Sequence, residues 1–162
     1  PKLEEIVITE GLAIRGGHRG GRWGIHQDFF EAQRILGTWE APQEGDVASL
    51  PSGATRTWEA IQADENGWFS QRGYVLTTVE MDEPKVMVLE ASGHSFVSVN
   101  GEPRTGDPYR TGWHQLPVQL DQGKNELLFY AGRGRQSSRS ARVQRFRIRF
   151  PLWRLDNDLR DF

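Results

Sequence analysis

The sequence predicts an all-β domain built as a sandwich, with one short helix near its N-terminus. The chain has 162 residues, which is the usual size of one domain, and 36% of them are hydrophobic, enough for a single core. Its 18 glycines and 8 prolines separate short apolar runs, many of which alternate with polar residues. Such runs are typical of strands joined by tight turns, so we treat residues 1–162 as one domain.

The N-terminal part contains the first expected strands. Residues 3–15 predict one or two short strands, with Ile6 and Ile8 on one face and Gly11 as a break. The glycine-rich residues 16–24 that follow are expected to form a loop, which has neither of the two common phosphate-binding spacings.

Residues 26–39 mix helix-forming residues with aromatic ones and predict the single helix. Gly37 is expected to end it, because glycine is favoured just past the C-terminal end of a helix. The expected apolar side consists of Phe29, Phe30, Ile35 and Leu36. The turn-rich residues 41–55 predict a surface connection.

From residue 56 onward, strand-like runs recur at the spacing of a sandwich. The runs are RTWEAI, GYVLTTVEM, KVMVLEA, SFVSV, WHQLPVQL, ELLFYAG and RVQRFRIRF. In the second run, Val75 and Val79 alternate with Tyr74 and Leu76, the period of two that half-buried strands show. Asn100-Gly101 predicts a two-residue hairpin, because a type I′ turn needs positive φ at both positions.

Residues 95–129 contain a series of short motifs. They are Val99-Asn100-Gly101, Gly106-Asp107-Pro108-Tyr109, Gly112-Trp113, Pro117-Val118 with Leu120, and Gly123, Asn125 and Leu127. The series resembles galactose-binding-domain-like modules, such as the N-terminal sugar-binding domains of family 2 glycosidases. It is more specifically similar to the noncatalytic β-sandwich that precedes the α/β-hydrolase unit of some large bacterial prolyl-oligopeptidase-like proteins.

The resemblance is clearest over residues 57–132, whereas the arginine-rich residues 133–162 depart from the family pattern. It implies a jelly-roll β-sandwich without a nucleophile, attached as an accessory domain to a hydrolase. We expect a periplasmic or secreted location, although the absence of cysteine fits cytoplasm and periplasm equally. No stretch approaches the roughly 20 apolar residues of a membrane span, and the first residues show no signal-peptide pattern.

No convincing catalytic site is found, so we expect the chain not to be an enzyme. Gly93-His94-Ser95-Phe96-Val97 approaches a nucleophile elbow, but valine replaces the second glycine and a strand is expected to follow Ser95. An ordinary turn is the better interpretation, although an independent hydrolase stays open as a minor alternative.

No cofactor is expected either. The four histidines are scattered and there is no cysteine, which leaves zinc little support. Structural calcium stays open, because sandwich modules of this kind sometimes hold it. Neither Asp64-Glu65 nor Asp82-Glu83, however, lies in a known calcium-binding frame.

The expected ligand-binding residues lie in the loop of residues 102–114. Asp107 can accept from sugar hydroxyls, Arg110 can donate to them, and Tyr109 and Trp113 can stack on a sugar face. Trp68, beside an Asn-Gly turn, is a further candidate. The alternative is that Tyr109 and Trp113 only cover the end of the sandwich. Three other tryptophans are expected to pack in the interior: Trp39, Trp58 and Trp153.

The net charge of −2 and pI near 6.1 predict neither a nucleic-acid partner nor a membrane partner. Arg145, Arg147 and Arg149 nevertheless alternate with apolar residues, which places three guanidinium groups on one face of an expected strand. They could protect a solvated sheet edge, because charge resists strand addition. They could also dock onto an acidic neighbouring domain.

Two hypotheses for function follow. The first is weak carbohydrate recognition by end loops, within an accessory module of a larger hydrolase. The second is a structural domain that docks onto the hydrolase domain of the same protein and binds no ligand of its own. Fold resemblance alone does not decide between them.

Overall fold

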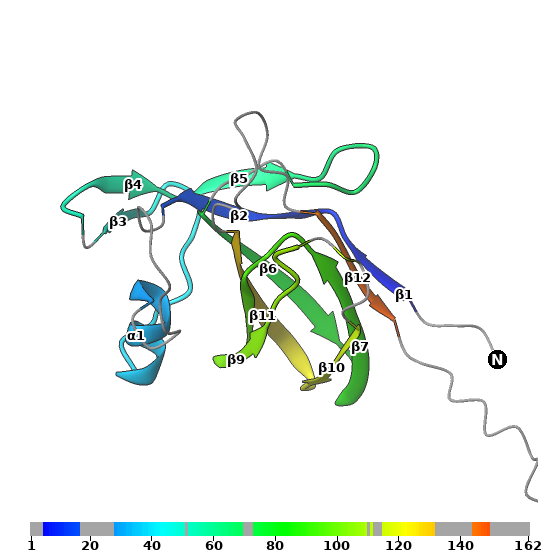
Figure 1. Ribbon diagram of the computed structural model, residues 1–162. Coiled ribbons are helices and arrows are strands. Elements are labelled where there is room, and N and C mark those ends of the chain that lie inside the picture. The colour runs from blue at the N-terminus through cyan, green and yellow to red at the C-terminus, as the bar shows by residue number, and fades with distance from the viewer. Residues whose placement is uncertain are drawn as a thin grey trace, which may run out of the picture.

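The computed structural model describes residues 5–16, 28–50, 52–69, 73–109, 111, 115–131 and the backbone of 144–149. These residues form two main sheets, one small hairpin and one short helix (Figure 1). The elements are β1 (Glu5–Ile8), β2 (Glu10–Arg15), α1 (Phe29–Ile35), β3 (Val47–Ser49), β4 (Thr55–Thr57), β5 (Glu59–Gln62), β6 (Gly73–Met81), β7 (Lys85–Ser92), β8 (Phe96–Val99), β9 (Glu102–Thr105), β10 (Gln115–Leu120), β11 (Gly123–Ala131) and β12 (Gln144–Arg149).

The two main sheets are antiparallel and pack face to face. One has four strands in the order β1-β12-β7-β10, and the other has six in the order β5-β2-β6-β11-β8-β9. The predicted all-β sandwich with one short helix is therefore confirmed for the described part of the chain. Its jelly-roll topology stays a prediction.

The main core lies between the two sheets and is built from alternate residues of the strands. On β6, Val75 and Val79 point into it, and on β7, Met87 and Leu89 do the same. Leu127 and Phe129 of β11 are completely buried in the same cluster. Because successive strand residues point to opposite faces, the residues between them on β6 and β11 are left on the outer face of the six-stranded sheet.

That outer face is also covered, by a second apolar cluster. Tyr74 and Leu128, which alternate with core residues, pack there against Phe30 of α1 and against Trp58. The Phe30 ring lies edge to face against Tyr74, with ring centroids 4.7 Å apart. The helix therefore lies against the six-stranded sheet, away from β1 and β12 (Figure 1).

The helix lies within the predicted residues 26–39 and is followed by Gly37 as expected, but only part of the expected apolar side is buried. The side chain of Asp28 accepts from the backbone N–H groups of Phe30 and Glu31 as an N-cap, and Gly37 follows the helix at a φ of 69°. Ile35 and Leu36, expected on the apolar side, are 70% and 74% exposed. The buried side consists of Phe30, Glu31 and the side chain of Arg34.

Three N-terminal details also differ from expectation. The strand structure is interrupted at Thr9, between β1 and β2, whereas Gly11 lies inside β2. A Cβ at Gly11 would stand 2.6 Å from the carbonyl oxygen of Leu76, so close strand approach explains this glycine. Residues 41–55 also include β3, which pairs with β4 in a hairpin.

Strand β12 is an interior strand. It pairs with β1 on one side and with β7 on the other, so the proposed role of its arginines as protectors of a sheet edge is wrong. The backbone register places Arg147 opposite Glu90 and Arg149 opposite Glu5. Docking of these arginines onto a partner stays a prediction.

Candidate functional site

The Asn100-Gly101 turn joins β8 to β9 as predicted. Val99 pairs directly with Glu102, and Asn100 and Gly101 have φ values of 48° and 87°. The backbone N–H of Asn100 donates to the carbonyl of Glu126 at 2.8 Å, and the Asn100 Oδ1 accepts from the Glu126 N–H at 2.9 Å. The tip of the hairpin is thus fixed to β11.

Asn125, which is completely buried, anchors the same region from below. Its Nδ2 donates to the carbonyl oxygens of Asp121 and Gly123 at 2.8 and 3.0 Å. Its Oδ1 accepts from the Asp121 N–H and from the side chain of Asn100, both at 2.7 Å. The start of β11 and the β8–β9 turn therefore form one hydrogen-bonded unit.

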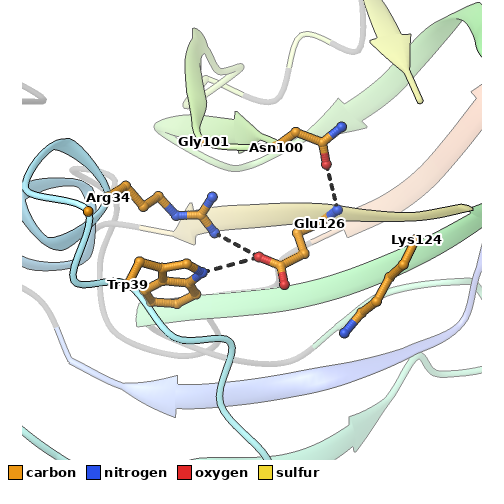
Figure 2. A pocket seen from close by; sticks show the side chains of 7 residues that line it. Arg34, Trp39, Asn100, Gly101, Lys124 and Glu126 are labelled. Carbon is orange, nitrogen blue, oxygen red and sulfur yellow. Dashed lines mark hydrogen bonds and ion pairs between the residues drawn. The ribbon is translucent and has the colours of Figure 1, made fainter. Parts of the chain in front are cut away.

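Next to this unit lies an open surface depression of about 390 Å³, which we call the Glu126 depression. It is lined by Arg34, Gly37, Trp39, Asn100, Gly101, Lys124 and Glu126. Figure 2 shows Glu126 in the middle, with Arg34 and Trp39 on one side and Lys124 on the other. The lining thus comes from the end of α1, the segment after it, the β8–β9 turn and β11.

The polar groups of the depression are joined through Glu126. The indole N–H of Trp39 donates to Glu126 Oε2 at 3.1 Å, and Arg34 Nη2 lies 3.6 Å from the same oxygen. The guanidinium carbon of Arg34 also stands 4.4 Å from the centroid of the Trp39 ring, a cation–π arrangement. These contacts hold Trp39 and Arg34 in fixed orientations on the sheet.

Behind Arg34 lies a buried carboxylate. Glu31 Oε1 is 3.9 Å from Arg34 Nε, and both side chains are almost fully buried. Burial raises the pKa of Glu31, while the nearby Ser98 hydroxyl and the charge of Arg34 act in the opposite direction. Burial lowers the pKa of Arg34, and Glu31 and Glu126 counter this effect. The guanidinium is therefore shared between two carboxylates from different elements.

Asp28 extends the buried network to the sheet. Its Oδ2 accepts from the hydroxyl of Tyr74 while Oδ1 caps the helix. Burial raises the pKa of Asp28, and its hydrogen bonds partly offset this. Burial and the charge of Asp28 also raise the pKa of Tyr74. Both ends of α1 are thus tied to the sheet by buried polar contacts.

Of the ligand residues predicted from the sequence, Asp107, Tyr109 and Trp68 are described, and none of the three lines the Glu126 depression. Asp107 is buried, and its Oδ1 accepts from the N–H and the hydroxyl of Thr111 at 3.0 Å, so this oxygen orders the loop itself. Tyr109 is 88% exposed and Trp68 is half-buried. Arg110 and Trp113 lie outside the described residues. Residues 102–105 of the expected loop form β9 instead, so the loop begins only after Thr105, at the end of the β8–β9 hairpin opposite to the Asn100-Gly101 turn.

Sequence reasoning missed most of the Glu126 depression. Arg34, Lys124 and Glu126 were not singled out, because charged residues on a helix and a strand are usually solvated. Trp39 was assigned to packing, and it does pack, against Phe30. Trp58 is buried as expected, and Trp153 lies outside the described residues. The sequence signal that could have located the site is the Asn-Gly turn, because this turn places Asn100 at the rim of the Glu126 depression.

The other chemical motifs are accounted for in the fold. Ser95 is followed by strand β8 rather than a helix, and its backbone pairs with Tyr130 and Gly106. His94 is buried against the Phe129 ring. Asp64 Oδ1 accepts from the backbone N–H groups of Asn66 and Trp68, which closes its turn.

The residues that the structure describes contain neither a metal-binding cluster nor a membrane-spanning helix. No three histidine, aspartate or glutamate side chains gather in a group that could hold a metal ion. Within those same ranges, no helix has the length and apolar character needed to cross a membrane.

Fold and site together define an all-β sandwich protein with a polar, tryptophan-bearing depression on the outer side of its six-stranded sheet. No protein-family model and no curated protein matches the chain.

Proposed function

We propose that this chain is a noncatalytic carbohydrate-binding module and that the Glu126 depression holds the sugar. The observation that carries the proposal is the convergence of an indole with the side chains of Arg34, Asn100, Lys124 and Glu126. Sugars carry many hydroxyls, which charged and amide side chains bind through hydrogen bonds, and here the indole forms a wall beside those side chains. The β8–β9 turn and β11 hold these groups on a rigid scaffold.

Binding is expected to be weak. The depression is open, so a monosaccharide there keeps much of its surface in water and displaces few ordered groups. We expect a Kd of roughly 0.1 to 1 mM, because only a small part of the interaction energy exceeds the cost of association. Such affinity suits a module that keeps an attached catalytic domain near a polysaccharide.

The resemblance over residues 57–132 supports an accessory role beside a hydrolase domain, in a periplasmic or secreted bacterial protein. One observation favours the second candidate function, docking to that domain. Ile35 and Leu36 expose their apolar side chains at the end of α1, beside the rim residue Gly37. An exposed apolar pair is a suitable contact for a neighbouring domain.

Sugar titration tests the proposal. Neutral mono- and oligosaccharides are added to the chain while tryptophan fluorescence and amide NMR shifts are recorded. We expect saturable shifts at the Trp39 indole N–H, Gly101 and Lys124, and weaker binding by Trp39→Phe, which lacks the indole N–H. Tyr109→Ala is the control for the loop predicted from the sequence and should bind as the wild type does.

The outcomes separate the candidates. Shifts confined to residues 106–114, with loss of binding by Tyr109→Ala, would move the sugar site to the loop. No shift with any sugar, together with tight association with a hydrolase domain that Ile35→Ser weakens, would replace sugar binding with docking.

A further inference from the structure

We infer that the Glu126 depression selects a neutral sugar through two adjacent free hydroxyls, which bind between Lys124, Glu126 and Arg34. The inference rests on the proposed function and specifies its ligand. It begins from hydrogen-bonding groups that the fold leaves available at the site.

Three such groups line the depression. Within the described part of the chain, Lys124 Nζ takes part in no hydrogen bond or ion pair, and its side chain is exposed. Glu126 uses Oε2 for both Trp39 and Arg34, which leaves Oε1 as an acceptor. Arg34 Nη1 has no hydrogen bond in the same ranges and faces Gly101, where a Cβ would lie 3.8 Å away. An acceptor is thus placed between two donors.

This order of groups matches the hydroxyls of a sugar. One hydroxyl can donate to the Glu126 carboxylate while it accepts from the Lys124 ammonium, because a hydroxyl carries one donor and two acceptor sites. The neighbouring hydroxyl can accept from Arg34. Hydrogen bonds to charged groups are stronger than hydrogen bonds between neutral groups. A pair of free hydroxyls can therefore form the strongest hydrogen bonds that the site provides.

The charges of the site argue against an acidic sugar. Lys124 and Arg34 supply two positive charges, and Glu126 together with Glu31, which pairs with Arg34, supplies two negative ones. No net positive charge is left to attract a carboxylate. The half-buried Glu126 would in addition repel it at close range.

Trp39 contributes less to selectivity than an exposed tryptophan would. The Arg34 guanidinium lies over its ring at 4.4 Å, and Phe30 packs against it edge to face with centroids 5.6 Å apart. These contacts leave the indole as a wall of the depression instead of a free stacking surface. Hydroxyl contacts therefore decide which sugar binds.

Three sets of probe sugars test this inference by NMR titration of the full chain. The first set contains the methyl glycosides of glucose, galactose and mannose, the second their fully O-methylated forms, and the third glucuronate. We expect at least one free glycoside to bind, and its O-methylated form to bind about tenfold more weakly or not at all, which is the loss of about 1.4 kcal/mol. Glucuronate should bind more weakly than glucose.

A matched pair of variants tests the role of Lys124. Lys124→Met should weaken binding about five- to tenfold without changing the fold, because this side chain is exposed and without a partner among the described residues. Lys85→Met makes the same charge change on β7 of the other sheet, where Lys85 pairs with Glu83, and should bind normally. Lys124→Gln replaces Lys124→Met if an amide spectrum shows that the latter is misfolded.

The possible failures are distinct. If O-methylated sugars or glucuronate bind as well as the free glycosides, or if both Lys124 variants keep full affinity, the hydroxyl model is overturned while sugar binding stands. If no sugar binds at all, the proposed function and this inference fail together.

Discussion

The side chains of Asn100 and Asn125 hydrogen-bond to each other, with Nδ2 of Asn100 donating to Oδ1 of Asn125 at 2.7 Å. This contact joins the tip of the β8–β9 hairpin to the buried start of β11. Lys124 and Glu126, which lie on either side of Asn125, are thereby fixed next to the turn. The rim of the Glu126 depression is thus shaped by two asparagines that do not need to touch a ligand.

Replacing Gly101 tests the turn. Gly101→Val should lower the free energy of unfolding by about 1 kcal/mol or more, because a β-branched residue is strained at a φ of 87°. Gly101→Asn should cost less, since asparagine tolerates left-handed backbone. Urea unfolding followed by circular dichroism measures both. Wild-type stability in Gly101→Val would contradict the turn assignment.

Removing the Asn125 amide should be costlier. Asn125→Ala leaves several buried groups of the β10–β11 turn without partners, and we expect a loss of about 2–3 kcal/mol in unfolding free energy. Asn66→Ala, in an exposed turn, is the matched control and should change stability by less than about 0.5 kcal/mol. Equal effects of the two variants would show that the Asn125 network adds nothing to stability.

The buried carboxylate of Glu31 predicts a pH dependence. Burial raises its pKa above the ordinary value of 4.5, so the folded chain holds this proton more tightly than the unfolded chain does. The contribution of Glu31 to stability is therefore full below about pH 4.5 and is lost as the pH rises through the folded pKa. Because glutamine does not ionise, Glu31→Gln should not show this loss of stability as the pH rises.

The measurement is urea unfolding at several pH values from 4 to 8. The stability of wild type relative to Glu31→Gln should fall as the pH rises above about 4.5. Glu65→Gln, in an exposed turn, should keep the wild-type profile. Parallel profiles of wild type and Glu31→Gln, or a difference that grows in the opposite direction, would contradict the prediction.

The chain is expected to lack esterase, peptidase and glycosidase activity by itself. Ser95 directly precedes strand β8, so it lacks the strand-to-helix turn that exposes a nucleophile, and His94 is buried against the Phe129 ring. Chromogenic substrates of the three classes should give no turnover above buffer. Activity that disappears in Ser95→Ala would contradict this expectation.

Local sequence signals determined much of the fold. Alternation along residues 73–81 predicted a half-buried strand; the strand and its two faces are observed, but Tyr74 and Leu76 on the outer face are buried as well. Asn100-Gly101 predicted its hairpin, because positive φ is a property of the residues at the turn. The helix and its end at Gly37 followed from equally local preferences.

Other features depended on contacts between distant residues. The apolar pattern predicted that Ile35 and Leu36 are buried, but both are exposed. The helix instead buries the side chains of Glu31 and Arg34. This is possible because Arg34 pairs with a second carboxylate, that of Glu126 on β11. The interior position of β12 likewise follows from its pairing with β1 and β7, which no local pattern encodes.

The sequence by itself therefore determined the long strands, the Asn100-Gly101 turn and the helix, since each depends on neighbouring residues and their backbone preferences, whereas the short strands β3 and β9 were not predicted. Only the tertiary structure decided the site. The Trp39 indole and the Glu126 carboxylate are separated by 87 residues, and they meet because the six-stranded sheet brings β11 beneath the segment that follows α1. A buried charge is stable only where such a partner is present, and the partner is supplied by the packing of the whole chain.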